Sequence, residues 1–182
     1  MRITITGPPG SGKSTVAKLL AKKLKLKHYS AGDIRREIAK KKGISLEELN
    51  KLDEKTHKTD KIADDFQKKL GKTEDNFVID GRLPHYFIPN SFKIFLYVDP
   101  KVGAQRVMER RKGVEVYKSV EEAQKKLAER EASDRKRYRD LYGIDYDKKS
   151  NFDLCIDTSK TTVEEIAEEI IKFTKQKPNI FK

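Results

Sequence analysis

The sequence predicts an α/β fold in which a five-stranded parallel sheet is flanked by helices. Short β-rich segments alternate with helical segments along the chain, and strands joined by helices form parallel sheets covered on both faces. The expected strands are Arg2–Thr6, Lys27–Ser30, Phe77–Asp80, Lys93–Val98 and Asp153–Asp157. A chain of 182 residues leaves little room for a second domain, so we expect a single domain over 1–182.

Helical segments fill the intervals between these strands. The first carries apolar residues at a spacing of four, Val16, Leu20 and Leu24, which is typical of an amphipathic helix. Ser119 followed by Glu122 has the capping-box spacing that marks a helix start. The expected helices are Lys13–Leu24, Ala31–Lys42, Ser45–Leu49, Thr56–Leu70, Pro100–Arg111, Ser119–Leu141 and Thr162–Lys175.

Composition narrows the class of protein. Lys and Arg number 41 against 29 Asp and Glu, which gives a net charge of +12. Such a surface fits nucleic-acid binding, attraction of small polyanions such as nucleotides, or the Lys/Glu-rich surface of a heat-adapted protein. Cys155 is the single cysteine, so we expect a small core residue in a protein of the reducing cytoplasm. We expect no signal peptide and no membrane segment.

The strongest motif is a phosphate-binding loop between the first strand and the first helix. Its residues match G-x-x-x-x-G-K-[ST] completely: Gly7, Pro8, Pro9, Gly10, Ser11, Gly12, Lys13, Ser14 and Thr15. Glycines let several backbone N–H groups point at one anion, and the helix that follows offers its positive end. We expect the whole loop to bind ATP, with catalytic Lys13 on the β- and γ-phosphates and Ser14 as a Mg²⁺ ligand.

This loop is shared by ATPases, GTPases, helicases and kinases, so other residues must distinguish among them. A kinase that acts on a nucleotide must also hold the acceptor phosphate. That task requires arginines from separate segments, because one guanidinium can grip two phosphate oxygens. Four segments of this chain supply such arginines.

The first segment follows the second strand and contains Ser30, Gly32, Asp33 and Arg36. It resembles the nucleoside monophosphate kinase family, whose adenylate kinase members carry Ser-Thr-Gly-Asp-x-x-Arg at this place. The resemblance implies that Ser30, Asp33 and Arg36 bind the acceptor, with Arg36 on its phosphate. We expect Arg35 to be a solvated neighbour.

The second segment is the end of the third strand, Asp80-Gly81-Arg82. A carboxylate at the carboxyl edge of a parallel sheet is well placed to join a Mg²⁺ shell, so we expect Asp80 to be a metal residue. A cap or turn carboxylate is the alternative. The Gly-Arg pair resembles that of cytidylate kinases, which implies that Arg82 holds the acceptor phosphate.

The third segment ends the helix after Pro100 with Arg106, Arg110 and Arg111. In the nucleoside monophosphate kinases, this helix and the loop after it form a lid, which here spans about 106–118. The resemblance implies that the three arginines close over the ATP phosphates and that Arg110 is catalytic. Ordinary surface charge is the alternative.

The fourth segment places Arg130, Asp134 and Arg137 on one helical face, at i, i+4 and i+7. A charged, solvated helix is the alternative. The stretch resembles the Arg-[Asp/Glu]-x-x-Asp-x-x-Arg of cytidylate kinases. The resemblance implies that both arginines contact phosphates, that Arg137 is catalytic and that Asp134 holds the ribose of CMP.

The resemblance to archaeal-type cytidylate kinases then extends over nearly the whole chain, including Arg137–Asp145 and Asp157–Ser159. It implies phosphorylation of CMP, or of dCMP, by ATP with Mg²⁺, and an acceptor-binding subdomain at about 31–71. We expect a cytoplasmic monomer without membrane or nucleic-acid partners. A kinase for AMP or UMP stays open, as does a nucleic-acid or ribosome-associated ATPase. The histidines, His28, His57 and His85, show no metal-ligand or triad spacing and are expected to be incidental.

Overall fold

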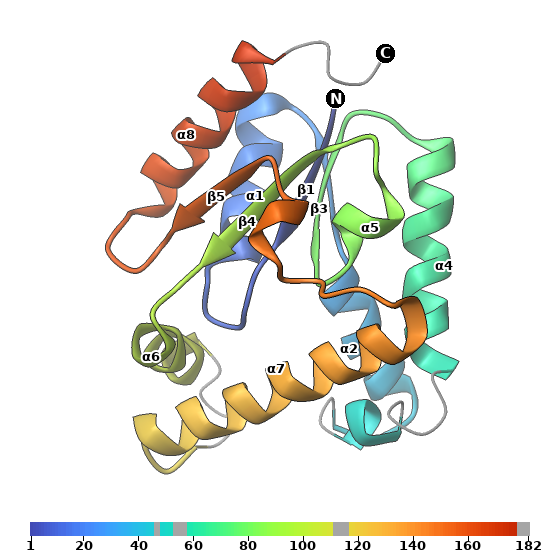
Figure 1. Cartoon of the computed structure of the whole chain (residues 1–182), viewed down its shortest axis with the longest axis vertical. Coiled ribbons are helices and arrows are strands. Elements are labelled where there is room, and N and C mark those ends of the chain that lie inside the picture. The colour runs from blue at the N-terminus through green and yellow to red at the C-terminus, as the bar shows by residue number, and fades with distance from the viewer. Residues whose placement is uncertain (46–47, 53–57, 111–116, 178–182) are drawn as a thin grey trace.

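The computed structural model describes residues 1–45, 48–52, 58–110 and 117–177 and confirms the predicted α/β class (Figure 1). Five parallel strands form one sheet in the order β2-β3-β1-β4-β5, and the strand that precedes the phosphate-binding loop (P-loop) lies in its centre. The strands are β1 (Arg2–Thr6), β2 (Lys27–Ser30), β3 (Phe77–Gly81), β4 (Phe92–Tyr97) and β5 (Leu154–Asp157).

The main helices lie close to their predicted positions. They are α1 (Lys13–Leu24), α2 (Ala31–Lys41), α4 (Lys58–Thr73), α5 (Pro84–Phe87), α6 (Pro100–Arg110), α7 (Val120–Tyr142) and α8 (Val163–Gln176), and residues 48–52 are also helical. Two short elements were not predicted, α5 and the 3₁₀ helix η1 (Lys149–Asn151). The expected helix start at Thr56 and the expected helix end at Arg111 lie outside the described residues.

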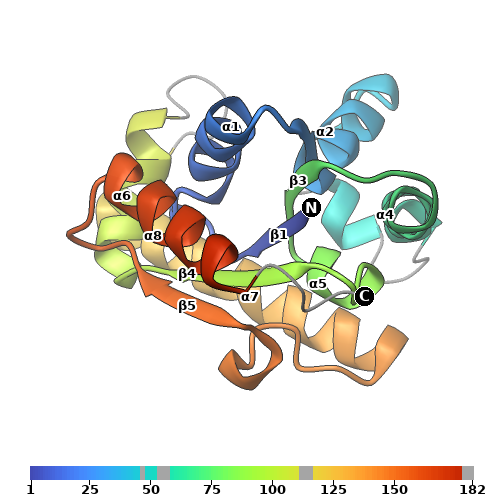
Figure 2. The same cartoon turned by 90° about the horizontal axis from the view of Figure 1, so that it is seen from above.

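The side chains of the central strand, β1, point alternately to the two faces of the sheet, so they contribute to two separate parts of the core. Ile3 and Ile5 pack with α1 and α8 on one face of the sheet. Thr6 points to the opposite face, where its Oγ1 lies 3.2 Å from Nδ1 of His85 on α5. The view from above shows α1 and α8 on one side of the sheet, with α5 and α7 on the other (Figure 2). Helices therefore cover both faces, as the sequence pattern indicates.

All functional segments meet at one edge of the sheet. Because the five strands are parallel, their carboxyl ends lie together. The P-loop follows β1 there, and Asp80 lies near the end of the neighbouring strand β3. Helix α7 crosses this edge from α6 to the side of α4 (Figure 1). The arginines of α7 are thereby brought to the P-loop from more than a hundred residues away in sequence.

Two further expectations concern exposure. Cys155 lies on β5, an edge strand, and is partly exposed, so the expectation of a core position is wrong. None of the described helices is both long enough and apolar enough to cross a membrane. The predicted acceptor-binding subdomain, about 31–71, and the predicted lid, about 106–118, lie partly outside the described residues and stay predictions.

Candidate active site

The P-loop folds around two glycines with positive φ. Gly12 has φ 78° and ends the loop, and α1 then begins at Lys13 with no side chain capping its N–H groups. Those free N–H groups and the helix dipole form an anion site. Gly10 also has φ 78°, and a Cβ on it would lie 2.2 Å from the carbonyl oxygen of Gly103. The loop therefore rests directly on the backbone of α6.

The reactive side chains of the loop are already ordered by the protein. Lys13 Nζ donates to the carbonyl oxygen of Pro8 at 3.0 Å, which holds the ammonium group over the loop. Ser14 Oγ donates to Oδ2 of Asp80 at 2.7 Å. The predicted Mg²⁺ pair, Ser14 and Asp80, is thus brought into contact although the two residues are far apart in sequence.

Asp80 is the most enclosed carboxylate of the site, at 2% exposure. Besides Ser14, it accepts from Ser30 Oγ at 3.3 Å and lies 2.8 Å from Nε2 of His28. The view of His28 as incidental is therefore wrong, because its ring fixes the orientation of this carboxylate. Ser30 also caps α2 by accepting from the N–H of Asp33.

The donor set fits Mg²⁺ rather than a transition metal. The hydroxyl of Ser14 and the carboxylate of Asp80 are hard oxygen donors, and Mg²⁺ is commonly held by one or two such groups together with substrate phosphates. Among the described residues, no group of three or more His, Cys, Asp or Glu side chains is arranged to hold a metal by itself. The site therefore matches an ion that arrives with a nucleotide.

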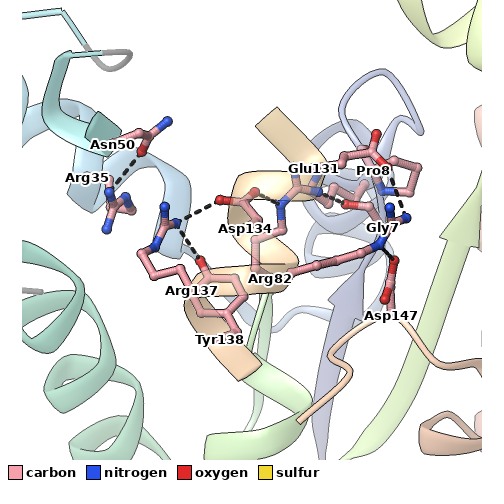
Figure 3. A network of polar contacts seen from close by, with 12 residues as sticks. Gly7, Pro8, Arg35, Asn50, Arg82, Glu131, Asp134, Arg137, Tyr138 and Asp147 are labelled. Carbon is pink, nitrogen blue, oxygen red and sulfur yellow. Dashed lines mark hydrogen bonds and ion pairs between the residues drawn. The ribbon is translucent and has the colours of Figure 1, made fainter. Parts of the chain in front are cut away.

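An arginine–carboxylate network links β3, the P-loop and α7 (Figure 3). Arg82 Nε donates to Oδ2 of Asp134 at 2.9 Å, and its Nη1 donates to the carbonyl oxygen of Gly7. Arg137 Nη2 donates to the other oxygen of Asp134 at 2.7 Å. Asp134 and Arg137 are both buried, so the alternative of a solvated helix face does not hold here; the roles predicted for them toward ribose and phosphate stay predictions.

The network carries more positive than negative charge. Burial alone would raise the pKa of Asp134, but the charges of Arg82, Arg137 and Arg130 outweigh burial and lower it. Nε of Arg130 is buried and has no hydrogen-bond partner within the described part of the chain. Three guanidinium groups outnumber the carboxylates of Asp134 and the neighbouring Glu131 in a poorly solvated place, so the cluster is suited to a bound anion such as phosphate.

The first turns of α2 present a more exposed pair. Arg36 Nε donates to Oδ1 of Asp33 at 3.1 Å, and the Arg36 side chain is 42% exposed. Arg35, expected to be solvated, is instead partly buried and donates to Oδ1 of Asn50 at 2.9 Å (Figure 3). The roles predicted for Asp33 and Arg36 toward an acceptor stay predictions.

The three predicted lid arginines occupy different surroundings. Arg106 donates to the carbonyl oxygen of Thr158 at 2.8 Å and to that of Gly10 at 3.5 Å, so it ties α6 to the P-loop. Arg110 is exposed at the end of α6. Arg111 lies outside the described residues. A role for Arg106 over the ATP phosphates would require it to leave its present contacts.

Two polar residues of α4 were missed altogether. Asp64 and Gln67 are buried, and Asp64 accepts a hydrogen bond from the hydroxyl of Tyr142 on α7. A signal was present in the sequence: Gln67 lies at i+4 from Ala63 and i−3 from Leu70, inside the apolar stripe of the helix. A polar residue in such a stripe marks an internal contact.

Comparison with known proteins points to one family. Residues 2–160 match the model of the cytidylate kinase-like family. The cytidylate kinase of Archaeoglobus fulgidus is 38% identical to this chain over 94% of it and 93% of that protein. The cytidylate kinase of Pyrococcus horikoshii is 45% identical over 89% of this chain and 82% of that protein.

Solved structures support the fold. A structure described as an uncharacterized protein from Eubacterium ventriosum has a TM-score of 0.68 at 25% identity and covers 96% of this chain and 98% of its own. The shikimate kinase of Acinetobacter baumannii, in complex with shikimate, has a TM-score of 0.62 at 18% identity and covers 98% of this chain and 94% of its own. At that identity, the likeness shows the fold alone.

Proposed function

The chain belongs to the cytidylate kinase-like family, and we propose that it transfers the terminal phosphoryl group of ATP to CMP, giving ADP and CDP. The observation that carries the proposal is the cluster of Arg82, Arg130 and Arg137 around Asp134, close to the P-loop. An ATPase without a nucleotide acceptor needs the P-loop but has no need of a second, separate phosphate site.

The donor phosphates lie in the P-loop. Its backbone N–H groups and the N-terminus of α1 bind the β- and γ-phosphates, and Lys13 exchanges its contact with the Pro8 carbonyl for phosphate oxygens. Ser14 and Asp80 would hold the Mg²⁺ of the ATP complex, and this ion would supply positive charge to the donor phosphates. Arg110 reaches the donor phosphates from the end of α6.

The acceptor phosphate lies against Arg82, Arg130 and Arg137, with Arg36 approaching from α2. Asp134 holds Arg82 and Arg137 in fixed positions, which lets the phosphate bind without reordering flexible side chains. An oxygen of the acceptor phosphate attacks in line, so no side chain needs to form a covalent bond. The guanidinium groups stabilise the charge that spreads over the transferred group.

Rates of ADP release with ATP and each of CMP, dCMP, UMP, AMP and GMP test the proposal. We expect CMP to give the highest kcat/KM. Preference for AMP or UMP would make the chain a nucleoside monophosphate kinase of another specificity. ATP hydrolysis that needs no nucleotide acceptor and rises with added RNA would contradict the proposal and favour a nucleic-acid-associated ATPase.

A further inference from the structure

Helix α4 buries a polar pair that the phosphate chemistry does not use. Asp64 and Gln67 are only 5% and 2% exposed, although Asp and Gln are seldom buried without a specific role. They lie one turn apart on the inner side of the helix, beside the buried residues Ala63 and Leu70. Burying a carboxylate and an amide here costs stability unless they bind something.

The hydrogen bonds of Gln67 determine how its amide is turned. Nε2 donates to the carbonyl oxygen of Ala63 at 3.1 Å and faces Oδ1 of Asp64 at 3.4 Å. Both neighbours are acceptors, so the NH₂ group must point at them. Oε1 of Gln67 is buried and receives no hydrogen bond from any residue that the structure describes. An N–H or O–H group of a bound molecule could satisfy a buried acceptor of this kind.

The pair lies beside the predicted acceptor site. The hydroxyl of Tyr142 donates to Oδ2 of Asp64, so the pair faces the last turn of α7, just beyond Arg137 and Tyr138 on the same helix. Figure 1 shows this end of α7 running to α4. Helix α2, which carries Arg36, packs against α4 from another side. A nucleotide whose phosphate binds the arginines of α7 can therefore extend its base toward α4.

We propose that Asp64 and Gln67 recognise the exocyclic amino group of the acceptor base and so distinguish cytosine from uracil. This inference rests on the proposed kinase activity and adds the base-reading residues to it. A carboxylate is the natural acceptor for the N4 amino group of cytosine. Oε1 of Gln67 can accept the second hydrogen of that group, which satisfies the orphan oxygen.

The same pair disfavours uracil. Uracil has a carbonyl oxygen, O4, where cytosine has its amino group, so the oxygens of Asp64 and Gln67 would face an acceptor with no hydrogen between them. Turning the Gln67 amide does not solve this, because its NH₂ group would then leave the carbonyl of Ala63. Sites built to accept a hydrogen bond reject analogues that lack the donor, because buried polar groups are left unpaired.

Asp64→Asn and Gln67→Met test the proposal by the ratio of kcat/KM for CMP to kcat/KM for UMP. We expect each variant to lower kcat/KM for CMP by about 10- to 100-fold and to leave the value for UMP equal or higher. The ratio therefore falls at least about tenfold, while the KM for ATP stays unchanged. Asp65→Asn is the matched control, because Asp65 is the next residue, is 56% exposed and pairs only loosely with Lys68.

The variants also separate base reading from a merely structural role. If the Asp64–Tyr142 contact only ties α4 to α7, Asp64→Asn and Tyr142→Phe lower the melting temperature and damage CMP and UMP turnover equally, which would overturn the proposal. Gln67→Met keeps the side-chain size and removes a buried unsatisfied oxygen, so it is expected to fold. An unchanged ratio in folded Gln67→Met and Asp64→Asn would likewise overturn it. Failure of the unmodified protein to use any nucleoside monophosphate would instead overturn the proposed function.

Discussion

Replacement of Asp134 by alanine should destabilise the protein far more than loss of an ordinary ion pair. Asp134 is 4% exposed and accepts from both Arg82 and Arg137. Its removal takes away the buried carboxylate that the guanidinium groups of Arg82 and Arg137 share, beside Arg130. Breaking a buried pair by removing one partner costs about 3–5 kcal/mol. For a chain of 182 residues, that loss corresponds to a melting temperature lower by roughly 6–20 °C.

Asp145→Ala is the matched control for this measurement. Asp145 also accepts from an arginine of α7, Arg139, at 3.1 Å, but its side chain is 53% exposed. Solvent screens such a pair, so we expect a much smaller loss than for Asp134→Ala. Urea denaturation of the three proteins at neutral pH gives the free energies of unfolding. Asp134→Asn, which can still accept a hydrogen bond, should fall between the unmodified protein and Asp134→Ala.

The pH dependence gives a second check. The pKa of Asp134 is lower in the folded protein than its ordinary value of 3.8, so its stabilising effect is complete above about pH 4 and is lost as pH falls through the folded pKa. The difference between the unmodified protein and Asp134→Ala should therefore be constant near neutrality and shrink only in strong acid. Equal losses for Asp134→Ala and Asp145→Ala, or a difference that disappears above pH 5, would refute the reasoning.

Three further predictions follow from the site. Lys13→Ala should lower kcat by about 10³-fold with an unchanged circular dichroism spectrum, because a transition-state charge is removed; near-normal turnover would contradict the P-loop assignment. Arg36→Ala should raise the KM for CMP by about 10- to 150-fold and leave the KM for ATP unchanged, since a charge-assisted hydrogen bond is worth roughly 1.5–3 kcal/mol. The control is Arg139→Ala, which removes an arginine of an exposed ion pair and should change neither KM. Burial lowers the pKa of His85 to about 4. As the pH falls, the unfolded chain therefore binds a proton on this ring before the folded protein does, and the free energy of unfolding decreases from about pH 6.5 toward pH 4. Between pH 7 and pH 5 the loss due to His85 is on the order of 2 kcal/mol, and His85→Gln should escape it; identical pH profiles for the two proteins would show that His85 is not buried in its neutral form.

The fold was predictable because local and long-range signals agree. Each strand is short, and all but β2 are rich in apolar residues. Each long helix has either an apolar stripe or a recognisable cap, as at Ser119, whose Oγ accepts from the N–H of Glu122 at 3.2 Å. The P-loop motif then fixed the direction of the first strand and helix. Helix α5 could not be predicted in this way, because the four residues Pro84–Phe87 are too few to show a period.

The site was predictable only where a motif names its residues. The contact between Ser14 and Asp80 follows from the meeting of strand ends at one sheet edge. His28 has no such signal, since a histidine in a strand reveals nothing about the carboxylate beside it until β2 and β3 are paired in register. Arg106 was assigned to a moving lid by resemblance, whereas its contacts with Gly10 and Thr158 depend on loop geometry that no periodicity encodes.

The contact between Gly10 and Gly103 determines which part of α6 can take part in a motion. A Cβ on Gly10 would lie 2.2 Å from the Gly103 oxygen, and one on Gly103 would lie 3.2 Å from the Pro9 oxygen, so the two backbones touch with no side chain between them. The first turn of α6 therefore forms one fixed frame with the P-loop. Any hinge must lie beyond this turn, nearer Arg110. If the part of α6 beyond it were exchanged between related enzymes, the chains should be joined after Gly103, so that Gly10 and Gly103 stay in contact.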